Sequence, residues 1–532
     1  MEFMNKSIFD HLNMSLDESC SSYNRYHCSF HEFEKTCFAL KSENSYIWLI
    51  DLFIRDELAT NNGLVMEYVF LELEKRRKFS LSFLINPSQT VSSISHIWRN
   101  ARVLEQEATD LFGVKFTRKY FPTYKFSEGN YPLRKNFQGQ VVGINNLSSD
   151  QSFNLELLSE NLLKRNLCKL DIKLKNNLVS ECHIQKGLFH VGIEKILEAS
   201  HLNQAFSLIE SYFPNRSCEI SFLLSTLLED SFDEKISDRA KAIRMVLLEL
   251  NRIQEHIKFL KNISEEFQLE SLYMNALVWL KKVQSLMMSY SGNEYLKGSI
   301  RLGGVVKDIG QVWLSRTINE LVWLEKSLNQ SYRNLIQSQY VKSAFDFRLM
   351  SKGVASTWSL SGPLARAVGI NLDYRKAFPF YFYEDIDFDI PIGVEGSGYD
   401  LLTVRVLEIF QSIKIIIQVL DNLPTGSILL KDRAAFLEMK QGQKELDEKT
   451  YFDSVKKLMI FPEMLNHKII EGSHGLLSLG LECRDSKIER FHMHSDSAAL
   501  VELFKKIIKG NEVHKVMPLW SILDVNLKEV EK

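Results

Sequence analysis

Apolar residues recur every three or four positions over residues 237–263, which is the spacing of one face of an α-helix. Charged residues fill the positions between them, so the pattern predicts one long amphipathic helix. Similar patterns cover residues 268–291, 310–342 and 400–420. Because four such helices bury their apolar faces only against one another or a partner, we expect a helical bundle. The apolar face of the first helix comprises Ile243, Val246, Leu247, Leu250, Ile253, Ile257 and Leu260.

Strand patterns lie on both sides of these helices in the sequence. Residues 46–87 contain apolar runs of strand length broken by the turn residues TNNG, and the last 60 residues alternate around GLLSLGLECR and IERFHMH. Residues 101–117 begin with helix formers and predict a short helix that ends at Gly113. A last helix is expected near residues 496–509.

With 532 residues, the chain is three to four times the length of a typical domain, so more than one domain is expected. The predicted fold class is α+β. A small N-terminal α/β domain is expected over residues 1–140. A large domain over residues 141–532 is expected to centre on the long-helix bundle, with small peripheral β-sheets. Residues 118–150, which are weakly periodic and contain Gly and Pro, are the predicted connector.

The composition limits the possible partners and compartments. Sixty-five basic and 67 acidic side chains give a formal charge of -2, which supplies no overall field for binding nucleic acid or an anionic membrane. The seven cysteines include no C-x-x-C pair, which fits a reducing cytosol better than a disulfide framework. No signal peptide is evident, and no apolar stretch reaches the ~18 residues that span a bilayer. We therefore expect a cytoplasmic protein that another subunit holds at any membrane.

Several long motifs resemble subunits of NADH:quinone oxidoreductase, complex I. The segment EQEATDLFGVKFTRKYFPTYKFSEGNYPLRKNF, residues 105–137, resembles the signature of the 30-kDa subunit. GLFHVGIEKILE and RAKAIRMVLLELNRIQEHI resemble the 49-kDa subunit, which is also the large subunit of group 4 NiFe hydrogenases and formate hydrogenlyase. Residues 362–426 contain GPLARAVGINLDYRK, YEDIDFDIPIG, VRVLEIFQS and DNLPTG in the family's order. The order of the two parts is that of fused C/D subunits.

The resemblance implies where the metal ligands of a hydrogenase would stand. A nickel-iron centre needs four thiolates from two C-x-x-C pairs. The first pair corresponds to Cys218 and Ser221 and the second to Asn526 and Glu529, so one thiol of four remains. A single cysteine does not make a four-thiolate cage, and a lone cysteine is more commonly a small buried apolar residue. We therefore expect no metal on this chain and no hydrogenase activity, as in energy-converting hydrogenase-related members that lack these ligands.

The resemblance also implies where a quinone would bind. In complex I a histidine and a tyrosine hold the quinone, and these positions fall on Asn146 and Glu219. Glu219 can donate a proton only if burial raises its pKa above about 4.3; otherwise it is a solvated or ion-paired carboxylate. His190 and Glu194 are spaced i, i+4, which suits one helical face, and the resemblance implies a proton-transfer role for Glu194; the alternative is an ion pair at a helix start or a capped surface. His183 and His190 lack a third metal ligand at motif spacing.

Other polar positions around this centre also depart from the family pattern, while the bundle motifs are retained. Asp400 and Arg405 keep the family residue. Each replacement removes a charge or a fixed donor, so the scaffold is kept and its centre is altered. The replaced positions are Val191, Ser397, Leu401, His474 and His494.

The sequence thus predicts a peripheral-arm subunit of a complex I-like or hydrogenase-related membrane complex, on the cytoplasmic side of the inner membrane. The resemblance implies a small iron-sulfur subunit, which carries the cluster, and membrane-arm subunits as partners. No Gly-rich dinucleotide fingerprint occurs, so NADH would be oxidised on another subunit. No nucleic acid is expected. The rival interpretations are a quinone reductase that uses Glu219 and a non-redox scaffold coupled to an ion- or solute-transporting membrane partner.

Overall fold

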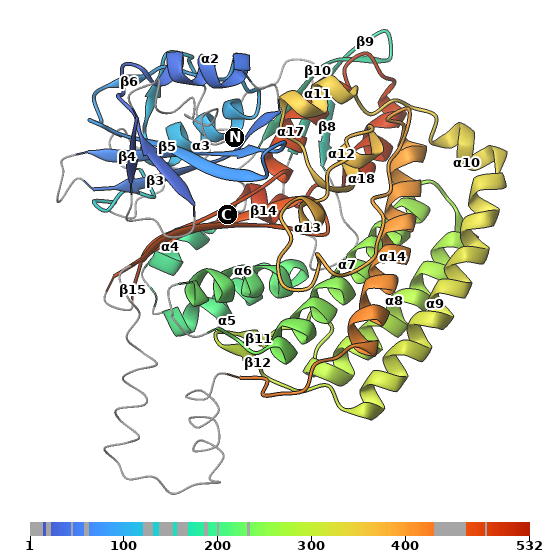
Figure 1. Ribbon diagram of the computed structural model, residues 1–532. Helices are drawn as coiled ribbons and strands as arrows, with labels where there is room; N and C mark the ends of the chain where they lie inside the picture. Colours follow the sequence, from blue (N-terminus) through green and yellow to red (C-terminus); the bar gives the residue numbers. More distant parts are fainter. Residues whose placement is uncertain are drawn as a thin grey trace, which may run out of the picture. The chain divides into compact units, whose positions relative to one another are not determined.

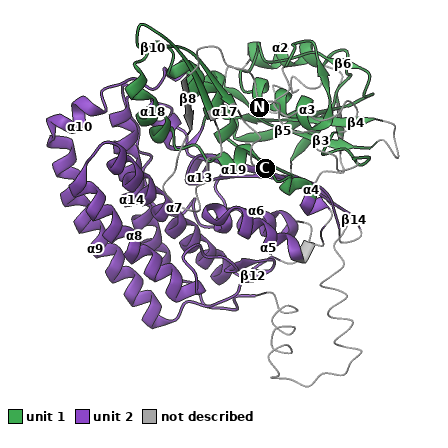
Figure 2. Ribbon diagram, turned by 180° about the vertical axis from the view of Figure 1, so that it is seen from behind, with its two compact units in different colours: residues 1–195, 353–360, 492–532 green, residues 196–352, 361–491 purple. Residues whose placement is uncertain are grey.

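The structure is a computed structural model that divides into two compact units (Figures 1 and 2). Unit 1 comprises residues 1–195, 353–360 and 492–532, and unit 2 comprises residues 196–352 and 361–491. The α+β class is confirmed, and the domain boundary at residue 140 stays a prediction. The described residues are 14–17, 23–43, 46–57, 63–120, 131–137, 153–156, 169–185, 190–198, 200, 202–230, 235–429, 464–484 and 487–532.

A five-stranded sheet forms the N-terminal part of unit 1, in the order β1-β2-β5-β4-β3. β2 and β5 are parallel, and the other neighbours are antiparallel. The predicted strand runs between residues 46 and 87 are confirmed as the three longest strands of this sheet. The strands are β1 (Ser15–Asp17), β2 (Asn24–His27), β3 (Ile47–Asp56), β4 (Leu64–Glu72) and β5 (Arg77–Ile85).

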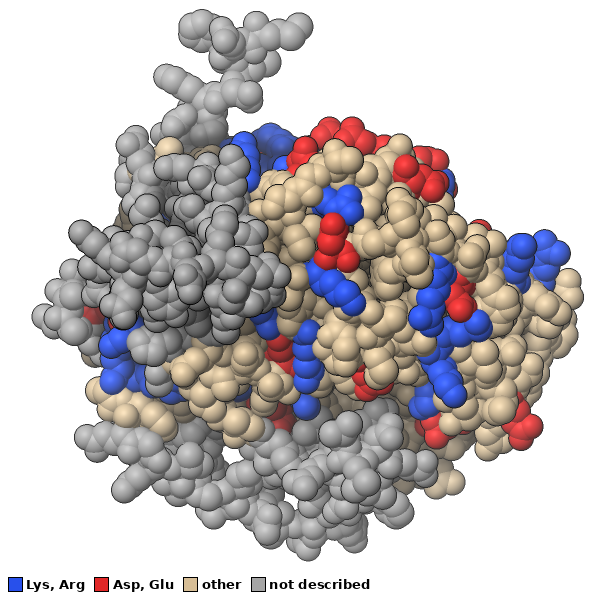
Figure 3. Space-filling view, turned by 90° about the horizontal axis from the view of Figure 1, so that it is seen from below, with Lys and Arg blue, Asp and Glu red and all other residues tan. Residues whose placement is uncertain are grey.

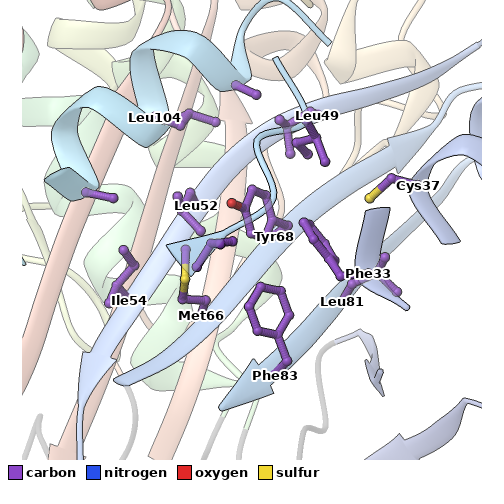
Figure 4. Packing of buried hydrophobic residues seen from close by; sticks show 14 of the residues in the cluster. Phe33, Cys37, Leu49, Leu52, Ile54, Met66, Tyr68, Leu81, Phe83 and Leu104 are labelled. Atoms are coloured by element: carbon purple, nitrogen blue, oxygen red, sulfur yellow. The ribbon is translucent and has the colours of Figure 1, made fainter. Parts of the chain in front are cut away.

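Helices α2 (Phe33–Glu43) and α3 (Ala101–Phe112) supply apolar side chains to the core of this sheet. In Figure 4, Phe33 of α2 lies beside Phe83 and Tyr68 of the strands, and their ring centroids are 4.7 Å from that of Phe33. α3 ends at Gly113, as predicted, and this residue has φ 68° and ψ 29°. Only glycine fits there, because a Cβ atom would come within 2.2 Å of the Tyr131 ring.

The rest of unit 1 consists of short strands and C-terminal helices. The predicted helix near residues 496–509 is confirmed as α17 (Ser497–Ile507), but it is not the last helix. Two further helices, α18 (Val516–Leu523) and α19 (Leu527–Val530), follow it, and they are too short to give a clear helical period. The short strands are β6 (Thr90–Val91), β7 (Lys115–Phe116), β8 (Phe153–Glu156), β9 (Lys169–Lys175) and β10 (Leu178–Gln185).

Unit 2 is centred on four long helices, which confirms the predicted bundle (Figure 1). α7 packs against α8 and α14, and α9 packs against the same two helices. The pattern over residues 310–342 is not one helix, because α9 ends at Gln337 and α10 (Gln339–Ala344) begins after the N-cap Ser338. The long helices are α7 (Asp238–Glu266), α8 (Glu270–Ser291), α9 (Gln311–Gln337) and α14 (Gly398–Asp421).

Smaller elements of unit 2 pack beside the bundle. The predicted C-terminal sheet is confirmed, with the strand order β13-β14-β15, and α6 packs against β13 and β14. These elements are α5 (Leu202–Tyr212), α6 (Ser217–Glu229), α12 (Gly362–Ala367), α13 (Tyr374–Ala377), β11 (Ile300–Arg301), β12 (Gly304–Val305), β13 (Met464–Glu471) and β14 (Leu476–Arg484). α4 (Ile193–Glu198), α11 (Lys352–Thr357) and β15 (Lys487–Ser495) run from one unit into the other.

On the face in Figure 3, basic and acidic side chains are interspersed, and neither sign forms a continuous field. None of the helices in the described part of the chain is both long enough and apolar enough to cross a membrane.

Candidate functional site

Glu219 lies in the first turn of α6 and forms a buried ion pair with Arg216. The distance between Arg216 Nη1 and Glu219 Oε2 is 2.6 Å, and both side chains are at most 3% exposed. A carboxylate in the first turn of a helix is also favoured by the helix dipole. The backbone N–H of Ser473 donates to Glu219 Oε1 at 2.8 Å. Both carboxylate oxygens therefore have strong donors.

These donors keep Glu219 ionised. Burial by itself would raise the pKa of Glu219, but the charge of Arg216, its hydrogen bond and the charge of Arg252 outweigh that effect. The pKa consequently lies below its ordinary value. A group that donates a proton to a quinone needs a raised pKa. The lowered pKa of Glu219 instead fits the alternative interpretation, in which Glu219 is an ion-paired carboxylate. Its role in catalysis stays a prediction.

The turn between β13 and β14 covers this ion pair. A Cβ atom on Gly472 would lie 2.6 Å from Arg216 Nη1 and 3.0 Å from Glu219 Oε2, so only glycine brings the backbone this close. Arg252 of α7 holds the turn by donating to the carbonyls of Glu471 and Gly472, each at 2.7 Å. Sequence reasoning did not find this contact, because the turn and Glu219 lie more than 250 residues apart.

The first pair of metal-ligand positions does not fit a nickel-iron group. Burial raises the pKa of the Cys218 thiol far above its ordinary value, and the nearby charges of Glu219 and Glu210 add to this effect. The hydroxyl of Ser221 donates to Glu210 Oε1 at 2.7 Å, and Arg301 pairs with the same oxygen at 2.6 Å. One thiol and one hydroxyl that is bonded to a carboxylate do not supply the two thiolates that this pair of positions would need.

The second pair of positions lies in unit 1 and is likewise internally bonded. The Asn526 side chain donates to Glu529 Oε1 at 2.7 Å, and the Ser497 hydroxyl donates to Glu529 Oε2 at 3.0 Å. Glu529 is 4% exposed. An amide and a hydrogen-bonded carboxylate do not replace bridging sulfur, so these residues do not fit the metal group either.

The predicted common helical face of His190 and Glu194 is wrong. α4 begins at Ile193, and Gly192 has a left-handed φ of 67°, so His190 lies before the helix. A left-handed residue at position 192 prevents the helix from extending back to residue 190. Burial is the main reason that the pKa of His190 lies below its ordinary value.

Glu194 instead belongs to a cluster of charges in unit 1. Lys532 Nζ lies 3.0 Å from both Glu194 Oε1 and Glu107 Oε1. His492 Nδ1 is 3.5 Å from Glu194 Oε1, and His492 Nε2 is 2.8 Å from Asp51 Oδ1. Glu107, Glu194 and His492 have a spacing that would suit a metal ion, but the Lys532 ammonium pairs with two of these groups.

The charges in this cluster shift one another's pKa values. Burial by itself would lower the pKa of His492, but Asp51 and Glu194 raise it to about 9 against the effect of Lys532. Burial would also lower the pKa of Lys532, and the carboxylates of Glu107, Glu194 and Asp51 reverse that effect. The cluster is therefore a set of mutually neutralising charges inside unit 1.

Unit 2 contains a second buried charge network that the sequence did not reveal. Arg366 donates to Glu408 at 2.7 Å and to Glu471 at 2.8 Å, and Arg375 pairs with Asp373 at 2.6 Å. The carboxylates are Glu249, Asp373, Glu408 and Glu471, and the arginines are Arg252, Arg366, Arg375 and Arg405. This network helps to fix the turn over Glu219, because Arg252 and Arg405 donate to its carbonyls.

Two of the remaining predicted positions can also be assigned. Ser397 and Asp400 form a capping box at the start of α14, in which the serine hydroxyl accepts from the backbone N–H of Asp400. The S-x-x-D spacing was visible in the sequence. Asn146 lies outside the described residues.

Comparison with known proteins identifies the chain's relatives. The family model of the respiratory-chain NADH dehydrogenase 30 Kd subunit matches residues 26–141, and that of the 49 Kd subunit matches residues 272–532. The chain belongs to these two families. They are joined in the order of a fused C/D protein, as the motifs predicted.

Individual relatives carry related names. A D-type NADH-quinone oxidoreductase subunit of Protochlamydia amoebophila is 27% identical over 68% of this chain and 92% of the relative. A C/D-type subunit of the same oxidoreductase from Acinetobacter baylyi is 26% identical over 74% of this chain and 73% of the relative. The C/D-type subunit from Bdellovibrio bacteriovorus is 24% identical over 76% of this chain and 75% of the relative. The chain is thus related to the C-type and D-type proteins of complex I along most of its length.

Proposed function

We propose that the chain is a peripheral-arm subunit of an NADH:quinone oxidoreductase or hydrogenase-related membrane complex, without a nickel-iron centre of its own. Its family membership supports the first part of the proposal. The second part rests on the Arg216–Glu219 ion pair, which lies beside Cys218 at the first metal-ligand position. A buried, mutually neutralised pair of this kind needs no metal, and its neighbour Ser221 is bonded to Glu210.

Elemental analysis tests the absence of the metal centre. The purified complex should contain no stoichiometric nickel bound to this chain, and it should not reduce dyes with hydrogen. The Cys218→Ser variant should behave like the wild type in both assays, because one thiol does not make a four-thiolate cage. Stoichiometric nickel, or its loss in the Cys218→Ser variant, would contradict the proposal.

A second candidate function, a non-redox scaffold, is favoured by the lowered pKa of Glu219. If Glu219 donated a proton to a quinone, Glu219→Gln would abolish quinone-linked electron transfer while leaving assembly intact. Because the ion pair keeps Glu219 ionised, we expect the activity between pH 5 and 8 to be the same in both proteins. A matched control is Glu255→Gln, which removes another buried carboxylate, one paired with Lys258 on α7. Loss of activity only in Glu219→Gln would restore Glu219 as the donor.

The partners follow from the same proposal. A small iron-sulfur subunit would supply electrons, membrane-arm subunits would anchor the chain on the cytoplasmic side of the inner membrane, and a quinone is the candidate acceptor. Gentle purification with chemical cross-linking should recover an iron-sulfur subunit linked to this chain. Recovery of transport subunits without any iron-sulfur protein would favour the scaffold.

A further inference from the structure

Four basic side chains from three separate segments of unit 1 converge on one area of its surface. Arg99 precedes the N-cap of α3, Arg102 is the second residue of that helix, Arg118 follows β7, and Lys506 lies on α17. α17 packs against α3, which brings these segments together. Arg99, Arg118 and Lys506 are exposed, and Arg102 is half-buried. We call these four residues the basic cluster.

Lys506 lies at the centre of this cluster. Its Nζ atom stands 4.7 Å above the ring of Trp358, which is 1% exposed. The segment that carries Trp358 is fixed beside α3, because the backbone N–H of Arg99 donates to the carbonyl of Thr357 at 2.9 Å. Burial lowers the pKa of Lys506, and the positive charges of Arg99, Arg102 and Arg118 lower it further. Like charges therefore lie close enough to repel one another.

The basic cluster carries a surplus of positive charge. Within the described residues, none of its four side chains forms an ion pair with a carboxylate. Arg118 donates to the neutral hydroxyl of Ser95, at 3.1 Å. The carboxylate that raises the pKa of Lys506 is that of Glu502, and this carboxylate pairs with Lys505 at 2.6 Å. Many other arginines of the chain, such as Arg216, are paired, so this surplus of positive charge is a local feature.

We propose that the basic cluster binds a phosphate-class oxyanion, either a free phosphate compound or the phosphate of a lipid headgroup. Three guanidinium groups offer forked N–H donors that match phosphate oxygens, and Lys506 adds a point charge. Arg99, Arg102 and Arg118 all lie close enough to Lys506 to act on its charge, which suits a compact anion with several oxygens. An oxyanion here would relieve the repulsion between the four cations. This site lies within unit 1 and does not depend on the proposed function.

Inorganic pyrophosphate is the probe for this site. In calorimetric titration of the full chain at low salt, we expect binding that weakens roughly tenfold in Arg102→Gln and in Lys506→Gln, since each loses one charge-assisted contact. Lys505→Gln is the matched control, because it neutralises the adjacent lysine of the same helix, which is already paired with Glu502. Thermal melting of each variant reports whether it is folded.

Vesicles distinguish the two sources of phosphate. Vesicles of phosphatidylcholine with phosphatidylglycerol, and of phosphatidylcholine alone, are tested by flotation with the same proteins. Pyrophosphate binding that is lost in both variants but not in Lys505→Gln supports the proposal. If binding to the anionic vesicles is lost in parallel, the phosphate is a headgroup; otherwise it is a free compound. No pyrophosphate binding, equal binding in all variants, or an equal loss in Lys505→Gln would overturn the proposal, whatever the vesicles do.

Discussion

Replacing His492 by glutamine should remove a pH-dependent part of the stability of unit 1. The imidazole lies between Asp51 and Glu194, and its pKa in the folded chain is about 9. The ordinary value, which applies to the unfolded chain, is about 6.5. Because the folded-state value is the higher one, the protonated imidazole stabilises the fold fully below pH 6.5. This contribution is lost as the pH rises through 9.

The size of the effect follows from the two pKa values. A shift of one pKa unit corresponds to about 1.4 kcal/mol. The rise in the pKa of His492 from about 6.5 to about 9 therefore contributes about 3 kcal/mol to the free energy of unfolding. The group is 4% exposed, so solvent screening does not reduce this figure much. We therefore expect wild type and His492→Gln to differ by about 3 kcal/mol more at pH 6 than at pH 10.

Urea-dependent hydrogen exchange with mass spectrometry measures this difference in unit 1 alone. The peptides to follow cover β3, which carries Asp51, and the rates are corrected for the effect of pH on intrinsic exchange. His96→Gln is the control, because His96 and Glu34 form an exposed pair at 3.5 Å that contributes little to stability. A difference between wild type and His492→Gln that is constant from pH 6 to 10 would refute the reasoning.

Two further substitutions test other polar contacts. Lys532→Met leaves the carboxylates of Glu107 and Glu194 without their shared ammonium and should destabilise unit 1 by about 3–5 kcal/mol in urea unfolding; a loss below 1 kcal/mol would contradict this. Ser397→Ala removes the side-chain acceptor for the N–H of Asp400 and should cost about 1 kcal/mol, seen as faster hydrogen exchange in the first turn of α14. Unchanged exchange there would show that the capping box adds nothing.

Features set by local sequence were predictable. The long helix α7 follows from its apolar spacing, and the end of α3 follows from Gly113. The break between α9 and α10 was missed because no Gly or Pro marks it; Ser338 provides only a cap, accepting from the N–H of Val341. The common helical face of His190 and Glu194 failed for the opposite reason, since Gly192 does mark the break but its effect was not considered.

The partners of Glu219 were predictable only in part, because one is near in the sequence and the other is distant. Arg216 and Glu219 are three residues apart, so an ion-paired Glu219 was open to sequence reasoning. Its second partner, Ser473, lies 254 residues away, and no local pattern indicates such a contact. The same holds for the pairing of Lys532 with Glu107. The family motifs located the individual positions, but the charges they meet depend on the folded chain.

These contacts explain why one substitution would not restore the first pair of thiolate ligands, which lies in unit 2. In Ser221→Cys, a thiol would stand next to Glu210, whose negative charge disfavours the thiolate that a metal needs. Cys218 is already held protonated by burial and by the charges of Glu219 and Glu210. The Arg216 guanidinium does not offset this, because it is occupied by Glu219. Glu219 and Glu210 would therefore have to change along with the ligands, so the carboxylates and the missing thiols act together against a metal centre.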